Sequence, residues 1–347
     1  MRDAIEMWKE PRMVVLTGVC AAVYAAAMVP FKALVVFPGL AEVRPAAALP
    51  IVFSFLFGPA GAFGAAFGNL GGDMMGGMLG PGSIFGALAN FAYGYLPYKL
   101  WRAFGGGDIG TALTGWRDRL PGWAKRPRVA AAALAVVFFA AGAALFGLDR
   151  SGALHLGGLI NYRWGSQTVP AGPVSTVVVL ALVATVAFGS VVYLIYAPIR
   201  YVLAVAGACL ACAGILAWGI DLLGFVPFSV FGPWILVQNF VLGLTLGPPL
   251  LLLVYPRVAK RYMRFEDIMP ETQRPVSAGW AWFTVAAMAA LVGLGIGIGT
   301  DWLGQVTGLS DTLSLGKGLS LVHPSLMVKS AALGVVVVIA GVGIWKL

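Results

Sequence analysis

The chain has 347 residues, of which 60% are hydrophobic and only 11% are charged, and its mean hydropathy is +0.89. This composition excludes a soluble globular domain and is typical of a polytopic membrane protein. The formal net charge of +9 does not indicate nucleic acid as a partner, because the Lys and Arg residues form short clusters between apolar segments, as in membrane topology signals.

Apolar segments of membrane-spanning length follow one another along the chain. Met13 begins the first, which we expect to be a retained helix and not a signal peptide, because no small-residue cleavage site precedes the next loop. Segments of this kind predict eight helices, at 13–34, 83–103, 129–147, 174–197, 200–223, 231–254, 278–298 and 325–346.

The glycine-rich stretch at 45–80 allows two interpretations. It could be one crossing followed by a loop, or two short helices that meet at Gly58-Pro59-Ala60-Gly61. With a cytoplasmic N-terminus, one crossing would place the basic residues of 99–128 outside the cell, whereas two crossings leave 17 of the 23 Lys and Arg residues on the cytoplasmic side. We therefore predict an all-α, multi-pass protein of the cell (inner) membrane, with about ten transmembrane helices and both termini cytoplasmic.

In this topology, polar and aromatic residues gather in the outer half of the membrane. A charge near the bilayer centre costs at least about 2.5–3.5 kcal/mol, so a ligand-filled or solvated cavity open to the outside explains them best. The candidate substrate-binding residues are Glu42, Arg44, Asn69, Asp73, Asn90, Trp218, Asp221, Trp234, Gln238 and Asn239.

Each candidate also has a structural interpretation. Asn69 and Asn90 could bridge helices through backbone carbonyls, and Arg44 could anchor the chain at the lipid headgroups. Asp73 indicates function more strongly, because a buried acid otherwise needs a cationic partner or a raised pKa.

The later candidates are equally open. Trp218 and Asp221 could form part of an interfacial belt. Gln238 and Asn239 are adjacent and therefore about 100° apart on a helix, so at most one of them faces a cavity squarely.

Motifs for catalysis and for cofactors are missing. The sequence contains no Gly-x-x-x-x-Gly-Lys-Ser/Thr, so we expect no ATP hydrolysis by this chain. His155 and His323 have no ligand partners at metal-binding spacing, and Cys209 and Cys212 are expected to be small buried residues. We therefore predict no metal, no cofactor, no catalytic residue and no enzymatic activity.

Two stretches carry a family resemblance. They read VRPAAALPIVFSFLFGPAGAFGAAFGNLGGDMMGG followed by PGSIFGALANFAYGYLPYKLW, and NFVLGLTLGPPLLLLVYPRV at 239–258. Both resemble the substrate-binding S component of energy-coupling factor (ECF) vitamin transporters. The resemblance implies a six-helix core that captures a vitamin-sized molecule from outside, together with a transmembrane scaffold subunit and ATPase subunits. It also implies that small residues of the first helix, here Ala21, Ala22, Ala25 and Ala26, contact the scaffold.

The resemblance divides the chain into core and additional segments. We expect a four-helix part of the core at 1–103, a cytoplasmic linker at 104–128, an inserted hairpin at 129–197, a two-helix part of the core at 198–275 and an appended hairpin at 276–347. The additional helices put docking on a standard energising module in doubt. A second hypothesis is therefore a non-transport subunit of a larger membrane complex that holds a lipid or pigment.

Overall fold

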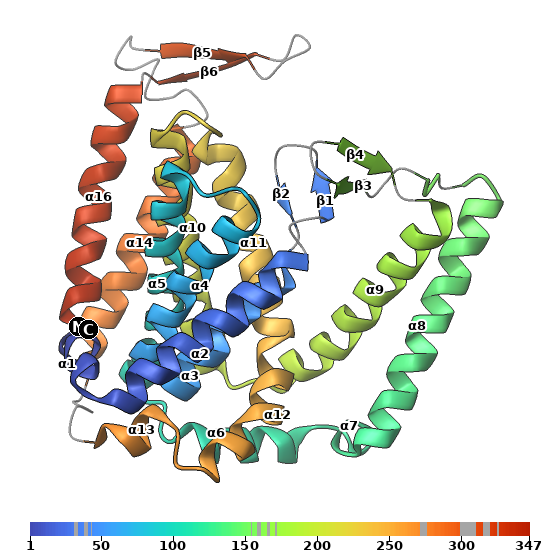
Figure 1. Ribbon diagram of the computed structural model, residues 1–347, viewed down its shortest axis with the longest axis horizontal. Helices are drawn as coiled ribbons and strands as arrows, with labels where there is room; N and C mark the ends of the chain where they lie inside the picture. Colours follow the sequence, from blue (N-terminus) through green and yellow to red (C-terminus); the bar gives the residue numbers. More distant parts are fainter. Residues whose placement is uncertain are drawn as a thin grey trace.

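The computed structural model covers residues 1–347, and it describes all of them except 31–33, 38–40, 43, 154, 158–160, 165–166, 171, 271–275, 299–309, 315–319 and 325. Long helices run between two ends of the molecule, with short strands at one end and short helices at the other (Figure 1). The helices are α1 (Arg2–Glu6), η1 (Met7–Lys9), α2 (Pro11–Met28), η3 (Pro45–Ala48), α3 (Leu49–Phe57), α4 (Pro59–Met75), α5 (Pro81–Ala103), α6 (Ile109–Arg119), α7 (Gly122–Lys125), α8 (Pro127–Arg150), α9 (Pro173–Ile195), α10 (Ile199–Leu222), α11 (Phe228–Thr245), α12 (Gly247–Ala259), α13 (Phe265–Ile268), α14 (Ala278–Ile298) and α16 (Leu326–Lys346).

The described helices fit a multi-pass membrane protein. Five are long and apolar enough to cross a bilayer, and these spans are Pro11–Met28, Arg128–Arg150, Ile199–Leu222, Phe228–Thr245 and Ala278–Ile296. The described residues also include three shorter apolar helices: Pro45–Phe57, Thr176–Gly189 and Leu333–Lys346.

The predicted break in the glycine-rich stretch is confirmed. α3 ends at Phe57 and α4 begins at Pro59, with Gly58 between them at φ +53°, a conformation that L side chains rarely adopt. A Cβ at Gly58 would also lie 2.8 Å from the ring of Phe265. α3 has nine residues, about 14 Å at about 1.5 Å per residue, and is therefore too short to span a bilayer. It is instead packed within the bundle, with Pro50 through Leu56 buried.

Glycines allow α4 to lie close to both α2 and α5. A Cβ at Gly64 would be 2.3 Å from the Cβ of Cys20, and one at Gly68 would be 2.7 Å from the carbonyl oxygen of Ala21. On the other side, a Cβ at Gly94 of α5 would be 2.9 Å from the Cα of Ala62. Small residues at these positions bring the backbones together, which is the usual basis of helix packing in membranes.

This packing predicts the effect of one added methyl group. Gly64→Ala should lower the free energy of unfolding by about 1–3 kcal/mol, because the new Cβ overlaps Cys20 in a closely packed interface. The matched control is Gly18→Ala in α2, where a Cβ meets no atom within 4 Å and improved helix propensity should be neutral or stabilising by up to about 1 kcal/mol. Thermal unfolding in detergent measures both, and equal effects would contradict the proposed packing.

The two additional hairpins differ in how they join the bundle. α14 packs on α10 and α11, and α16 packs on α14. Glycines again allow the close approach, since a Cβ at Gly295 would lie 2.3 Å from the ring of Phe228. In contrast, α8 contacts mainly α9 and α7, and α9 reaches α11 and α12, so this pair leans away from the bundle (Figure 1).

Short strands modify the expected all-α fold. The helix predicted at 13–34 ends at Met28 and is followed by β1 (Leu34–Phe37) and β2 (Ala41–Glu42), and the two β-branched valines of β1 favour extended backbone. These strands form one antiparallel sheet, in the order β2-β1-β3-β4, with β3 (Asn161–Trp164) and β4 (Gln167–Pro170). A second, two-stranded sheet consists of β5 (Ser310–Ser314) and β6 (Ser320–Pro324).

Two further expectations need correction. The helix predicted at 231–254 is divided into α11 and α12 at Leu246, where Gly247-Pro248-Pro249 removes two backbone N–H donors. The segment 104–128, expected to be a linker, contains α6 and α7. Its residues Ile109, Leu113 and Trp116 are buried, so α6 is part of the packed structure.

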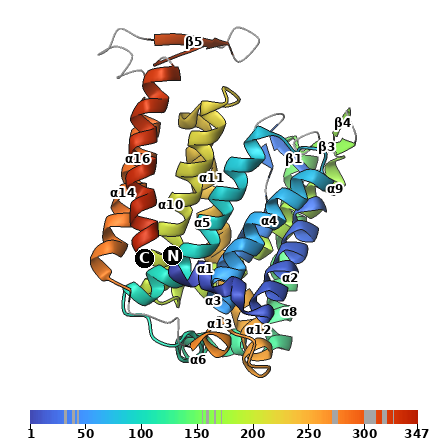
Figure 2. The same cartoon turned by 60° about the vertical axis from the view of Figure 1, so that its left-hand side comes forward.

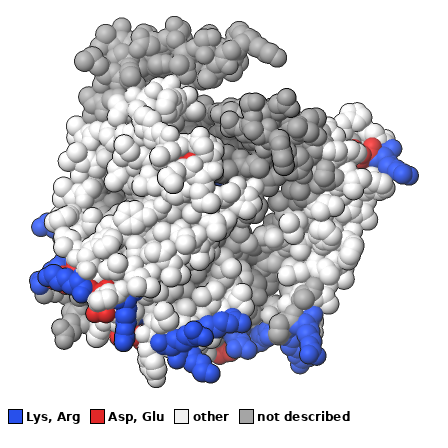
Figure 3. Space-filling model, viewed as in Figure 1, with Lys and Arg blue, Asp and Glu red and all other residues white. Residues whose placement is uncertain are grey.

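Basic side chains gather at the end of the molecule formed by α1, α6, α7, α12 and α13, which we call the basic end (Figure 3). Both chain termini lie there, side by side in two views (Figures 1 and 2). The amino group of Met1 donates to the carbonyl oxygen of Trp345 at 3.2 Å. This arrangement agrees with an even number of crossings.

Candidate functional site

Four polar side chains from three helices form one chain of hydrogen bonds. The Tyr24 hydroxyl donates to Asn90 Oδ1 at 2.9 Å, Asn90 Nδ2 donates to Asn69 Oδ1 at 3.1 Å, and Asn69 Nδ2 donates to Asp73 Oδ2 at 3.3 Å. All four side chains are at least nine-tenths buried. The structure thus brings together Asn69, Asp73 and Asn90, in the half of the bundle away from the basic end.

The local sequence accounts for this arrangement. Asn69 and Asp73 are four residues apart and therefore share one face of α4. Asn90 lies on α5, where its Nδ2 also donates to the carbonyl oxygen of Gly86 at 2.8 Å. A Cβ at Gly86 would be 2.7 Å from Asn69 Nδ2, so glycine leaves the space that the amide of Asn69 occupies.

A second polar group joins α5, α10 and α11. Asn239 Nδ2 donates to Cys212 Sγ at 3.3 Å, and the Tyr93 hydroxyl donates to the carbonyl oxygen of Asn239 at 3.2 Å. Cys209 lies next to this group, with its Sγ 4.0 Å from the Tyr93 hydroxyl. As predicted, Cys209 and Cys212 are free and buried.

Arg44 lies within electrostatic range of both polar groups, the one that contains Tyr24 and the one that contains Cys212. It lies directly before η3, is half-buried, and is close enough to Tyr24 and Cys212 to interact electrostatically with both. Asp73 also acts electrostatically on Tyr24. A cationic and an anionic side chain therefore both lie within electrostatic range of the Tyr24 hydroxyl.

The candidates near the ends of α10 and α11 differ in their burial and in their hydrogen bonding. Asp221 and Gln238 are buried, like Asn239, and Trp234 is half-buried. Gln238 Oε1 has no hydrogen-bond partner among the described residues, so a buried acceptor is available on α11. Gln238 and Asn239 are thus both buried, although adjacent residues point in different directions.

Two candidates lie elsewhere or cannot be placed. Trp218 packs edge-on against Phe85, with ring centroids 5.7 Å apart, and lies 3.8 Å from the Cβ position of Gly334 on α16. It therefore points toward the appended hairpin, and its Nε1 has no partner among the described residues. The backbone of Glu42 pairs with Val35, and its side chain lies outside the described part of the structure.

The four alanines of α2 divide between two faces. Ala25 is buried and lies 3.6 Å from the Cβ position of Gly71, and Ala21 lies against Gly68. Ala22 and Ala26 are exposed. These two alanines are the most accessible of the four to a neighbouring subunit, and Ala21 is half-buried.

Sequence reasoning missed Tyr24 and Cys212. Tyr24 was a lone aromatic in an alanine-rich helix, and Cys212 was expected only to fill space. A usable signal was the spacing of Cys20, Tyr24 and Met28, which repeats every four residues and predicts one buried face on α2.

The described residues suit hydrogen bonding to a polar ligand better than catalysis. Amides, hydroxyls, a carboxylate and a guanidinium provide both donors and acceptors. Within the described ranges no group of three or more His, Cys, Asp or Glu side chains could hold a metal ion.

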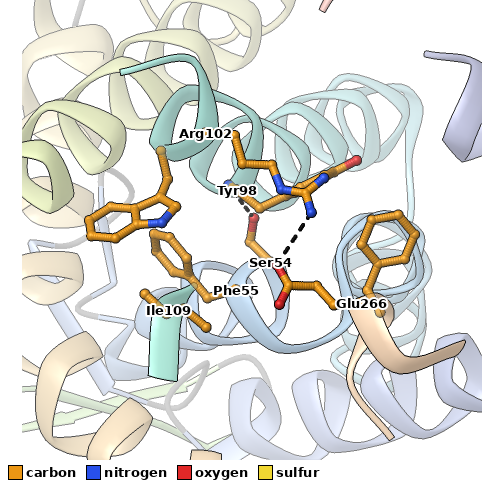
Figure 4. Close-up of a pocket in the computed structure, with 8 residues that line it drawn as sticks. Ser54, Phe55, Tyr98, Arg102, Ile109 and Glu266 are labelled. Atoms are coloured by element: carbon orange, nitrogen blue, oxygen red, sulfur yellow. Dashed lines mark hydrogen bonds and ion pairs between the residues drawn. The ribbon is translucent and has the colours of Figure 1, made fainter. Parts of the chain in front are cut away.

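A small cavity at the basic end serves a different purpose (Figure 4). Its volume is about 20 Å³, which is enough for one water. Two interactions lie beside the cavity. The Ser54 hydroxyl accepts from the Tyr98 backbone N–H at 3.2 Å, and Arg102 forms an ion pair with Glu266 at 3.3 Å. Tyr98 follows Pro97, which interrupts the α5 hydrogen-bond pattern, so Ser54 compensates for a local defect. We assign this cavity to the packing of the helix ends.

The described helices are those of a multi-pass membrane protein, and a comparison with protein families agrees with a transporter. Residues 14–155, about two fifths of the chain, match the QueT transporter family model, which confirms the resemblance to ECF-type S components. This match to a transporter family, over less than half of the chain, supports a membrane transporter of the S-component type for a small molecule. The matched residues include α8, which we had expected to depart from the family pattern. Curated proteins and solved structures give no significant match.

Proposed function

We propose that this protein is the substrate-capture component of an ECF-type importer in the cell (inner) membrane. In this proposal it has about ten transmembrane helices and cytoplasmic termini, and it binds a small molecule in a cavity open to the outside. The observation that carries the proposal is the buried hydrogen-bond chain from Tyr24 to Asp73. Tyr24 and Asp73 lie in the last turns of α2 and α4, two helices that run away from the basic end (Figure 1). The positive-inside rule assigns the basic end to the cytoplasm, and the polar cluster then faces outward.

The side chains of the site indicate the kind of ligand. Asn, Gln and Asp side chains recognise the hydrogen-bonding edges of nucleobases, because each offers paired donors or acceptors in one plane. The matched family transports a queuosine precursor. We therefore propose a planar, nucleobase-like precursor of this kind as the substrate, instead of a vitamin in the wider sense.

Substitution of the charged residues tests the site. Arg44→Ala and Asp73→Ala should each weaken binding of a queuosine precursor about ten- to hundredfold, as expected for loss of one charge-assisted hydrogen bond. Arg44→Ala should leave the melting temperature near that of the wild type, whereas Asp73→Ala removes the acceptor of Asn69 Nδ2 and should also lower the free energy of unfolding by about 1–3 kcal/mol. Isothermal titration and thermal unfolding of purified protein measure the two quantities.

A control separates the site from general charge effects. Arg117→Ala removes an exposed cation at the basic end and should leave binding unchanged. If Arg44→Ala loses stability in proportion to binding, the cluster is a structural network, and the proposed site is wrong.

Co-purification tests the proposed energising module. On α2, Gly18, Ala22 and Ala26 are exposed at intervals of four residues, so a scaffold helix could approach this face closely. The importer proposal predicts that ATPase subunits and a scaffold subunit are recovered with the protein from native membranes. A stable complex without ATPases would instead support the second candidate, a non-transport subunit that holds a lipid or pigment.

A further inference from the structure

A second cavity, of about 510 Å³, lies at the basic end between α6 and the beginning of α10. Its walls include Trp101, Asp108, Trp116, Arg119, Ile199 and Arg200. Nothing in the proposed capture of a ligand uses this cavity, which is at the opposite end of the bundle from the Tyr24–Asp73 cluster.

The cavity is positively charged, because its one acid is already paired. Asp108 Oδ1 accepts from Arg264 Nη1 at 3.1 Å, and Asp108 Oδ2 caps α6 by accepting from the Thr111 backbone N–H at 2.8 Å. Arg200 donates from Nη1 to the carbonyl oxygen of Gly105, and a guanidinium has several further donors. Arg119 is exposed and has no ion-pair partner within the described residues. An anion would therefore find two arginines available.

The surroundings of the cavity are typical of a membrane interface. α6 lies flat across the basic end (Figure 1), with Leu113 and Trp116 buried beneath it and its arginines exposed, as in an interfacial amphipathic helix. Ile199 in the cavity wall is 68% exposed, and Ile195 at the end of α9, four residues earlier in the chain, is 70% exposed. A ligand here would contact cations at one end and hydrocarbon at the other.

We propose that this cavity binds the phosphate headgroup of an anionic phospholipid of the inner leaflet. Arg119 and Arg200 would hold the phosphate, and the acyl chains would lie along the apolar surface at Ile195 and Ile199. Basic pockets on the cytoplasmic side of membrane proteins recognise anionic headgroups in this way. A free phosphate would use the same arginines but would gain nothing from the apolar side, so we assign the site to lipid.

Native mass spectrometry of the full chain in detergent, titrated with phosphatidylglycerol, tests the site. Arg119→Gln should weaken binding of the first lipid about fivefold. The matched control is Arg117→Gln, which removes an exposed arginine from the same helix but outside the cavity and should leave binding unchanged. Arg119 is exposed, so both variants should keep the melting temperature of the wild type, and Arg200→Gln provides a second variant on the opposite wall.

Each possible outcome decides the proposal. Selective weakening by Arg119→Gln and Arg200→Gln supports it. Equal weakening by Arg117→Gln would show only diffuse attraction of anionic lipid to a basic surface and would overturn it. Equally effective binding of phosphatidylcholine, or displacement of the lipid by inorganic phosphate, would also overturn the assignment to an anionic lipid.

Discussion

Asp3→Ala is expected to lower the free energy of unfolding by about 3–5 kcal/mol, the cost of leaving a buried charge without its partner. Lys99 Nζ lies 2.9 Å from Asp3 Oδ2, and the side chains are only 10% and 4% exposed. The Tyr95 and Tyr98 hydroxyls also donate to Asp3, at 2.9 and 2.6 Å. One carboxylate therefore holds α1 against α5. Its loss leaves two buried hydroxyls without their acceptor, and it leaves the Lys99 ammonium with only the carbonyl oxygen of Leu347, at 2.9 Å.

An exposed ion pair on the same short helix provides the control. Arg2 and Glu6 form an i,i+4 pair in α1, with the arginine side chain 68% exposed. Glu6→Ala should therefore cost less than about 1 kcal/mol. Denaturation in mixed micelles compares the two variants, and similar losses would contradict the role that we assign to burial.

The ionisation of Asp3 should also make the free energy of unfolding depend on pH. Burial opposes its ionisation, but the Lys99 ammonium and the hydrogen bonds from Tyr98 and Tyr95 outweigh this, and the pKa of Asp3 is lowered below its ordinary value of 3.8. A lowered folded-state pKa adds stability that is fully present above the ordinary pKa and is lost as the pH falls toward the folded value. The stability difference between wild type and Asp3→Ala should therefore narrow below about pH 4. A constant difference would contradict an ionised Asp3.

Asn90→Leu is the second change with a large expected effect, on both binding and stability. Asn90 accepts from Tyr24 and donates to Asn69 and Gly86. Leucine would leave a buried hydroxyl and a buried amide oxygen unpaired, at about 1–3 kcal/mol each. It would also remove the centre of the proposed site. We therefore expect no stabilisation of this variant by a queuosine precursor, whereas the wild type should gain about 2.7 kcal/mol at a hundredfold excess over Kd.

Tyr24→Phe distinguishes the two effects of Asn90. It removes only the first hydrogen bond of the chain and leaves the contacts of Asn90 with Asn69 and Gly86. We expect a loss of about 1–3 kcal/mol in stability, with stabilisation by ligand still detectable. If Asn90→Leu is stabilised by ligand as much as the wild type, Asn90 is a packing residue and not part of the site.

Those features that follow from local chemistry could be predicted from the sequence. The lengths of the apolar segments predicted the helices. The distribution of charges predicted a break near Gly58, and the structure confirms this break, with Gly58 at a positive φ. Polar residues in glycine-rich helices predicted that Asn69, Asp73 and Asn90 converge, because glycine interfaces leave space for side chains inside the bundle.

The remaining features depend on contacts between distant segments. The Asp3–Lys99 pair joins residues that both belonged to expected cytoplasmic segments, and only the folded bundle shows that they are buried. The break between α11 and α12 was overlooked because Gly247-Pro248-Pro249 lies inside a continuous apolar run. Trp218 was assigned to the site by depth alone, but its direction depends on α16, whose position the sequence does not reveal.

The most direct test of the central claim is binding of a labelled queuosine precursor to oriented membrane vesicles that contain the protein. We predict saturable binding to right-side-out vesicles, loss of that binding in Asp73→Ala, and retention in Arg117→Ala. Binding confined to inside-out vesicles, or equal binding by wild type and Asp73→Ala, would contradict an outward-facing site built on the Tyr24–Asp73 cluster.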